Sequence, residues 1–242
     1  MLIQRMLGAN CLFMDNGKVN EFNPEFFSAF HTALDELELE GSPLVLASRK
    51  KTFSAGLDLI RLLRFEREAL SAFIKEMDHL LLRVLRYPAP VVAAVEGPAL
   101  AGGAILALCA DLTIARPQAR MGLTETAVGL PFPAVAEAIA TLNLAAHRTR
   151  EVLVLGHSYT GDDLLHTGLA GQLHPEPVKA ALSIHWPEPH AALAIKQDLA
   201  ESIEERAGHK AHLDAEFVEH WFSPAGQKAL EATVARLQKR AP

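Results

Sequence analysis

Two glycine-containing turns are the parts of this 242-residue chain whose residue types and spacing suit catalysis. In the first, Phe53-Ser54-Ala55-Gly56 follows a predicted buried strand and leads into a predicted helix that starts near Asp58. In the second, a buried strand passes through Gly97 and then Ala101-Gly102-Gly103 into an apolar helix. Backbone N–H groups at a helix start lack intrahelical partners and carry partial positive charge, and glycine lets a ligand approach them closely. Two such groups that converge on one point would form an oxyanion hole, although the spacing alone also fits two ordinary tight turns.

The sequence does not indicate other kinds of site. Neither turn matches GxGxxG or a P-loop, so a cradle for nucleotide phosphates is not expected. The eleven histidines form no HExxH arrangement, and His209 and His212 are predicted to be surface or interface residues of a helical tail. The two cysteines, Cys11 and Cys109, lie in apolar surroundings and are predicted to be buried thiols. We therefore expect no metal and no separate cofactor.

Three ordered motifs resemble those of the crotonase (enoyl-CoA hydratase/isomerase) superfamily. They are Phe53–Leu59, Gly97–Gly103 and Gly122–Leu130, and the stretches 161–169 and 217–237 also fit, so the resemblance covers most of the chain. It implies an α/β fold, a crotonase-like spiral of ββα units with a C-terminal helical region that assembles homotrimers or hexamers. It also implies an acyl-CoA thioester as substrate, with its enolate stabilised by the backbone N–H groups of Leu57 and Gly102.

The reaction within this superfamily depends on the catalytic carboxylates. Its hydratases have two glutamates, because hydration must activate a water and also protonate the α-carbon. Glu125 fills the second of these positions, but the first is Ile105, which cannot transfer a proton. One carboxylate is enough to move a double bond from C3–C4 to C2–C3, because a single base can take the proton from C2 and return it at C4. The motifs containing Leu57 and Glu125 are similar to the mitochondrial type of Δ3,Δ2-enoyl-CoA isomerase, and this resemblance implies the same activity with Glu125 as the base.

Several alternatives remain open at this point. One is an enoyl-CoA hydratase, or another acyl-CoA lyase or hydrolase of the superfamily, that takes its second catalytic group from elsewhere. Another is a non-catalytic acyl-CoA-binding member. Considered without the resemblance, Glu125 would more often be a solvated or helix-capping carboxylate.

The remaining binding residues are expected around the two turns. The resemblance implies substrate contacts at Ala55, Gly56, Asp58, Leu59, Leu62, Gly103, Ile105 and Phe132. The basic run Arg49-Lys50-Lys51, together with Phe53, precedes the first turn, where the family binds the nucleotide end of CoA. Positive charge there would attract the CoA phosphates. A solvated basic turn and plain core packing are the alternative interpretations of these residues.

Apolar periodicity predicts the elements that position these motifs. Helical spacing predicts helices over 25–40 and 67–86, and short apolar runs predict buried strands at 43–48, 91–95 and 112–115. Strands separated by helices favour a largely parallel sheet, and Asp15-Asn16-Gly17 predicts a hairpin. We place the spiral core at 1–185. The proline-rich stretch 186–189 then leads into a helical C-terminal oligomerisation region at 186–242.

Composition excludes several classes of protein. The net charge is −6, from 23 Lys and Arg against 29 Asp and Glu, and no run of five like charges occurs. Nucleic-acid partners and a polybasic membrane patch are therefore not expected. Half of the residues are apolar, which excludes intrinsic disorder. The longest apolar run, 99–110, is shorter than the roughly 18 residues that a membrane span requires. With no secretory signal in the sequence, we expect a cytoplasmic protein.

Overall fold

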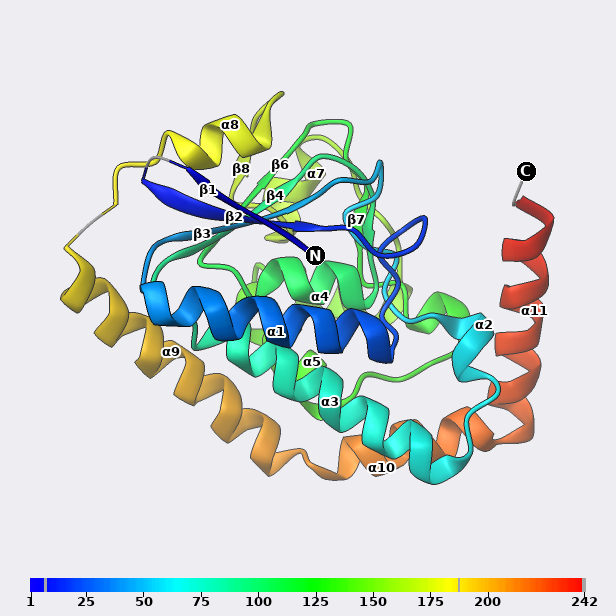
Figure 1. Ribbon diagram of the computed structural model, residues 1–242. Helices are drawn as coiled ribbons and strands as arrows, with labels where there is room; N and C mark the ends of the chain where they lie inside the picture. The colour runs from blue at the N-terminus through cyan, green and yellow to red at the C-terminus, as the bar shows by residue number, and fades with distance from the viewer. Residues whose placement is uncertain (7, 187, 241–242) are drawn as a thin grey trace.

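A six-stranded, mostly parallel sheet forms the middle layer of the structure (Figure 1). The computed structural model describes residues 1–6, 8–186 and 188–240. The sheet order is β1-β2-β3-β4-β6-β8. These strands span Leu2–Met6, Ala9–Met14, Leu44–Ser48, Val91–Val95, Leu112–Ala115 and Gln172–Leu173, respectively. β1 and β2 pair antiparallel, whereas the other neighbouring strands pair parallel.

The three strands predicted from apolar runs are confirmed as β3, β4 and β6. All of β4 is buried, and so is β3 from Leu44 to Ala47. A parallel sheet that is covered on both faces has continuous apolar strands, because no face is left for polar residues. This explains why these strands lack an alternating pattern.

The hairpin predicted around Asp15-Asn16-Gly17 is wrong. The antiparallel pair lies earlier, between β1 and β2, and the chain turns at 17–19 without forming a returning strand. Gly17 and Asn20 both take positive φ, 55° and 51°. The buried Asn20 side chain donates hydrogen bonds to Ser48 Oγ (2.8 Å) and to Phe53 O (3.0 Å). These bonds lead the chain to the first glycine turn instead of back along β2.

Helices cover both faces of the sheet. One layer contains α1 (Pro24–Glu40), α3 (Arg67–Leu85), α4 (Gly102–Leu108) and α5 (Ala134–Asn143), and the opposite face carries α8 (Pro177–Leu182) (Figure 1). The helices predicted at 25–40 and 67–86 are confirmed as α1 and α3. Asn23 caps α1 by accepting from Phe26 N at 2.9 Å, and Gly41 ends the helix in the left-handed conformation.

A second, two-stranded parallel sheet joins the two glycine turns. It consists of β5 (Ala99–Leu100) and β7 (Met121–Gly122), and sequence periodicity does not predict either strand. Isolated bridges extend it: Ser54 pairs with Ala99, and Phe22 pairs with Leu57. Both turns and the segment before α1 are therefore held by one backbone network.

The C-terminal helices fold back on the rest of the chain. α9 (Pro189–His209) packs on α5 and α3, α10 (His212–Phe222) packs on α3, and α11 (Pro224–Arg240) contacts α2 (Leu59–Leu62) and η1 (Thr126–Val128). In Figure 1, α9 and α11 lie at opposite ends of the molecule, joined by α10. The short helices α6 (Thr149–Leu155) and α7 (Asp163–Thr167) complete the fold.

An ion pair between a buried lysine and an exposed aspartate fastens α9 to the sheet layer. Lys196 is 7% exposed, and its Nζ atom donates to Asp111 Oδ2 (2.8 Å) and to Ala89 O (2.9 Å). The proposed division at 185/186 stays a prediction, and residue 187 of the predicted hinge lies outside the described residues. Among the residues that the structure describes, no helix combines the length and the apolar character needed to cross a membrane.

Candidate active site

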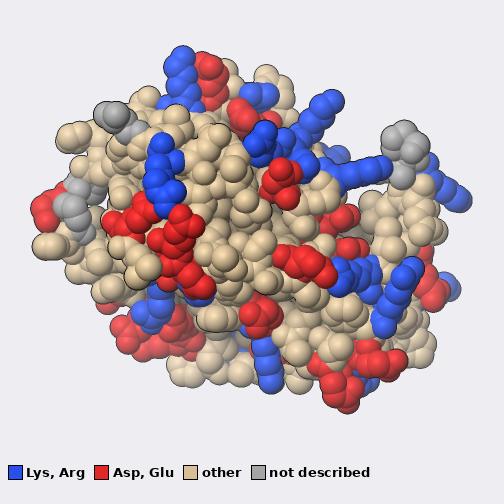
Figure 2. All heavy atoms as spheres, viewed as in Figure 1, with Lys and Arg blue, Asp and Glu red and all other residues tan. Residues whose placement is uncertain are grey.

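A cavity of about 660 Å³ lies between the two glycine turns and the C-terminal helix. Its walls come from both turns, from the segment around Glu125, from α3 and α5, and from α10 and α11. The deep walls are mainly apolar, with Met77, Leu81, Ile105 and Phe217 among them. Figure 2 shows the surface hollowed between α11 and the body of the molecule, with acidic and basic side chains nearby.

The first turn presents the N–H group of Leu57 to this cavity. Phe22 N donates to Gly56 O at 2.7 Å, and Asp58 N donates to Phe22 O at 3.1 Å. This parallel pairing fixes Gly56 and Asp58 and leaves the Leu57 N–H on the other side of the strand, where it donates no hydrogen bond to any described residue. Gly56 has φ +76°, a conformation that glycine takes without steric strain.

The second turn presents the N–H group of Gly102 in a similar way. Gly102 is the first residue of α4, so its N–H has no intrahelical partner, and it donates to no other described group. The preceding residue, Ala101, has φ 50° and ψ −127°, which an L-residue rarely adopts. Its N–H donates to Gly122 O at 2.9 Å. Such a conformation costs about 1–3 kcal/mol. The hydrogen bonds of the second sheet maintain it, and it points the start of α4 at the cavity.

The two turns touch at their glycines. A Cβ atom placed on Gly56 would lie 2.9 Å from Gly102 N and 3.0 Å from Leu100 O. One placed on Gly102 would lie 2.9 Å from the ring of Phe22. A side chain at Gly56 would push the turns apart, and one at Gly102 would displace the Phe22 ring. Glycine therefore allows close contact between the two turns that carry these N–H groups, and an oxyanion hole requires two such donors near each other.

Glu125 is a buried carboxyl group in the cavity wall. Its residue is 8% exposed, and its Oε2 atom has no hydrogen-bond partner among the described residues. Burial raises the pKa of this carboxyl group to about 8, because the charged form loses its solvation. Its backbone is fixed, since Glu125 O accepts from Val128 N (3.0 Å) and Leu130 N (2.9 Å) around η1. A carboxyl group with such a pKa can both take and return a proton near neutral pH.

The comparison with protein families decides the identity of this arrangement. The enoyl-CoA hydratase/isomerase family model matches residues 10–242. The chain belongs to this family. It therefore has the crotonase fold expected from the three motifs, and it is a crotonase-family acyl-CoA enzyme.

Relatives of this chain have names that give different reactions. A Thermus thermophilus protein assigned as an enoyl-CoA hydratase is 32% identical over 212 residues, which are 84% of this chain and 77% of that protein. The crystal structure of human mitochondrial Δ3-Δ2-enoyl-CoA isomerase superposes with a TM-score of 0.90 at 25% identity, covering 100% of this chain and 99% of that one.

One further relative carries both names. A Mycobacterium tuberculosis protein is called an enoyl-CoA hydratase in one crystal structure and an enoyl-CoA isomerase in another. The latter structure matches with a TM-score of 0.79 at 27% identity, over 89% of this chain and 98% of that one. The names of these relatives therefore do not decide which reaction this chain performs.

The structure brings seven of the predicted site residues together around the cavity. They are Ala55, Leu57, Asp58, Leu59, Gly102, Ile105 and Glu125. Gly56 and Gly103 instead pack between the turns, and a Cβ atom on Gly103 would lie 2.4 Å from Ser54 O. Phe53, Leu62 and Phe132 lie in the hydrophobic core and are not part of the cavity lining.

The basic run before the first turn also lies outside the cavity lining. Arg49 and Lys51 are exposed, and Lys50 forms an ion pair with Asp15.

Sequence reasoning missed other lining residues. Lys18 and Glu21 reach the cavity because Asn20 anchors their segment to the first turn. Thr233 and Leu237 reach it because α11 folds back. No local sequence signal indicates either long-range placement.

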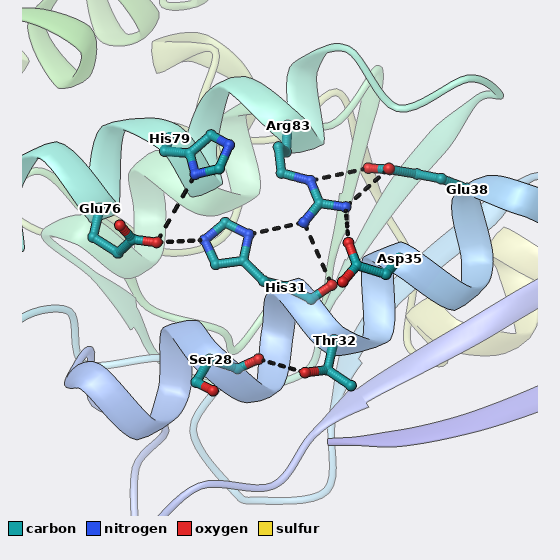
Figure 3. A network of polar contacts seen from close by, with 8 residues as sticks. All are labelled: Ser28, His31, Thr32, Asp35, Glu38, Glu76, His79 and Arg83. Carbon is teal, nitrogen blue, oxygen red and sulfur yellow. Dashed lines mark hydrogen bonds and ion pairs between the residues drawn. The ribbon is translucent and has the colours of Figure 1, made fainter.

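A histidine cluster away from the cavity has the residue types of a metal site. His31, Glu76 and His79 place possible ligand atoms within 4.8 Å of one another, between α1 and α3 (Figure 3). Arg83 Nη1 lies 3.0 Å from His31 Nδ1. Because arginine can only donate, Nδ1 accepts, and the neutral ring then carries its proton on Nε2, 3.3 Å from Glu76 Oε1. Both ring nitrogens thus contact protein groups, and the cluster links α1 to α3.

Proposed function

We propose that this family member is a Δ3,Δ2-enoyl-CoA isomerase. The observation that carries the proposal is the buried carboxyl group of Glu125 in the same cavity as the N–H groups of Leu57 and Gly102, all without a hydrogen-bond partner among the described residues. Ile105 lines the cavity at the position where a family hydratase would have its other glutamate. The similarity to the human isomerase structure over the whole chain supports the same reaction.

The proposed reaction uses one base and two backbone donors. The thioester oxygen accepts hydrogen bonds from Leu57 N–H and Gly102 N–H, which stabilise the negative charge that forms when a proton leaves C2. Glu125 takes this proton, and the C3–C4 double bond shifts through a planar dienolate. The protonated Glu125 then delivers the proton to C4, so the double bond ends between C2 and C3 and the carboxylate is restored.

The electrostatics of Glu125 suit this cycle. Its pKa of about 8 makes it a stronger base than a solvated glutamate, and its apolar surroundings favour return of the proton. Only the ionised form can take a proton from C2. Activity at limiting substrate is therefore expected to rise as pH increases toward about 8.

We also propose that Arg49, Lys50 and Lys51 attract the phosphates of CoA. The net charge of −6 gives no general attraction for an anionic substrate, so local positive charge must supply it. Arg49 and Lys51 are exposed on the segment that leads into the first turn. The C-terminal region 186–242 is proposed to assemble a homotrimer or hexamer, which the exposed apolar side chains of Ile195 and Leu199 on α9 support.

A second candidate reaction has one observation in its favour. Besides Glu125, the cavity is lined by the carboxyl groups of Glu21 and Asp58. Either could supply the second group that hydration of a 2-enoyl-CoA needs. Asp58 is less suited, because its Oδ1 atom already accepts from Arg61 N (3.0 Å) at the start of α2. An enoyl-CoA hydratase with its second carboxylate at Glu21 is therefore the alternative.

The deciding experiment gives the purified protein a 3-enoyl-CoA and a 2-enoyl-CoA of the same chain length. The isomerase proposal expects conversion of the first compound well above hydration of the second. Faster hydration of the 2-enoyl-CoA would overturn it in favour of the hydratase. Turnover of neither, with binding of both retained, would indicate a non-catalytic acyl-CoA-binding protein. The variant Ile105→Glu restores a second carboxylate and is expected to gain hydration.

A further inference from the structure

The backbone of Glu21 is fixed directly beside the first glycine turn. Phe22 pairs with Leu57, which places Glu21 next to Gly56 in the parallel register. The segment is held from both sides, since Ala55 N donates to Val19 O at 3.0 Å and Ser54 Oγ donates to Asn20 O at 2.8 Å. Glu21 therefore lies opposite Gly56, which directly precedes Leu57, one of the two proposed oxyanion donors.

The side chain of Glu21 lines the cavity and has no partner among the described residues. The residue is partly buried, and among the described residues its carboxylate forms no hydrogen bond and no ion pair. Burial is the main cause that raises its pKa, and the nearby carboxylate of Asp58 raises it further. A carboxylate in this position is costly unless a ligand or a cation compensates it.

The charged groups around the cavity are mostly acidic. Glu21 and Asp58 line it beside Glu125, whose pKa of about 8 leaves it mostly protonated at pH 7.5, whereas Lys18, which is exposed, is the lining residue with positive charge in the described chain. A cavity of about 660 Å³ is small enough that any charge inside it lies within roughly 10 Å of these carboxyl groups. In surroundings of low dielectric, repulsion between like charges at such distances is only weakly screened.

We propose that Glu21 is a specificity-determining residue, which makes the cavity accept neutral acyl groups and reject acyl groups that carry a carboxylate. The inference rests on the proposed function, because it assumes that acyl-CoA binds in this cavity. It names the substrate class as thioesters of uncharged acids. It also disfavours decarboxylation as the reaction, since the substrate of a decarboxylase must bring a carboxylate into the site.

The test compares two CoA thioesters of equal chain length. Hexanoyl-CoA ends in a methyl group and adipoyl-CoA ends in a carboxylate, and neither contains a double bond to be turned over. Calorimetric titration of both into the wild-type protein, Glu21→Gln and Glu68→Gln gives three ratios of dissociation constants. Glu68 is exposed on α3, outside the cavity lining, so Glu68→Gln matches the change in net charge.

The wild-type protein is expected to bind hexanoyl-CoA more tightly than adipoyl-CoA by roughly 10-fold or more at pH 7.5. In Glu21→Gln this ratio should fall at least severalfold, whereas Glu68→Gln should keep the wild-type ratio. Lowering the pH should reduce the wild-type ratio, because protonation of Glu21, whose pKa burial raises, removes its charge. This fall should be smaller in Glu21→Gln. Circular dichroism and thermal melting confirm that the variants are folded, and Glu21→Ala serves as a second variant if Glu21→Gln is not.

Two results would overturn the inference, and both differ from failure of the proposed function. One is equal binding of the two thioesters by the wild-type protein. The other is strong discrimination that Glu21→Gln and Glu21→Ala leave unchanged. If the wild-type protein binds neither thioester, the acyl-CoA assignment itself is wrong.

Discussion

Glu125 and Asp78 are two buried carboxyl groups with similar electrostatics and different surroundings. Each is 8% exposed, and each has one carboxylate oxygen without a hydrogen-bond partner among the described residues. Burial raises the pKa of both to about 8. Glu125, however, lines a cavity that also contains two free backbone N–H groups, whereas Asp78 is not part of its lining. Asp78 lies on α3, which packs on α10, and Asp214 of α10 raises its pKa further.

The difference shows what a raised pKa means. The shift at Asp78 reports burial beside another acid, and no described group lies there to stabilise a developing negative charge. At Glu125 the same shift is combined with space for a substrate and with donors for its oxygen. A raised pKa therefore marks a candidate site only where a cavity and complementary groups accompany it.

The largest expected effect separates the two carboxyl groups by activity. Glu125→Gln removes the proposed base and should lower kcat for 3-enoyl-CoA isomerisation by roughly 10²–10⁴-fold. Asp78→Asn makes the same chemical change outside the cavity and should retain wild-type turnover. Steady-state kinetics on both purified variants checks this. If Glu125→Gln retains more than about a tenth of the activity, another residue is the base.

The next prediction concerns the donors that distinguish the Glu125 region. Gly56→Ala places a Cβ atom 2.9 Å from Gly102 N, so it should separate the two turns and lower kcat by roughly 10²-fold. Gly161→Ala is the matched control. Gly161 also has positive φ, 59°, but a Cβ atom there meets nothing within 4 Å. Both variants carry the conformational strain, and only Gly56→Ala carries the collision. Equal activity of the two variants would show that the contact between the turns is not needed for catalysis.

A third prediction concerns stability at Asp78. Its folded-state pKa of about 8 lies above the ordinary value of 3.8, so the folded protein binds the proton more tightly. The contribution of Asp78 to the free energy of unfolding should therefore be highest below about pH 4 and should decrease as pH rises toward 8. Asp78→Asn removes this loss and should be more stable than wild type by about 1–3 kcal/mol at pH 8.5.

Urea unfolding of wild type and Asp78→Asn at pH 5 and at pH 8.5 tests this dependence. The stability advantage of the variant should grow between the two pH values. An advantage that is the same at both would mean that Asp78 ionises in the folded protein at its ordinary pKa.

Much of the fold and the central part of the site could be predicted from the sequence. The helices α1 and α3 and the strands β3, β4 and β6 follow from local periodicity, because one face or both faces of each are buried. The glycine motifs indicate the two turns because close backbone contact excludes side chains there. The family and its fold followed from these same motifs.

The features that the sequence did not predict depend on contacts between distant residues. Glu21 reaches the cavity through the side chain of Asn20, which bonds a segment more than thirty residues away. The hairpin prediction failed for the same reason, since this contact outweighs the local turn signal. Leu62 and Phe132 were expected in the cavity because apolar residues near a site can either line it or pack behind it. Composition does not distinguish these two positions.

The smallest expected effect tests whether strain distinguishes the cavity from the α3 region. Ala101 has φ 50°, so Ala101→Gly should relieve strain that exceeds the added entropy of the unfolded chain. We expect a gain of about 1 kcal/mol, a rise in Tm of about 2–4 °C for a chain of this size. Ala72→Gly makes the same substitution at an exposed position inside α3 and should cost about 1 kcal/mol. Thermal melting should therefore move in opposite directions for the two variants. If both lower Tm equally, the turn before Gly102 holds no strain, and the start of α4 is directed at the cavity by hydrogen bonding alone.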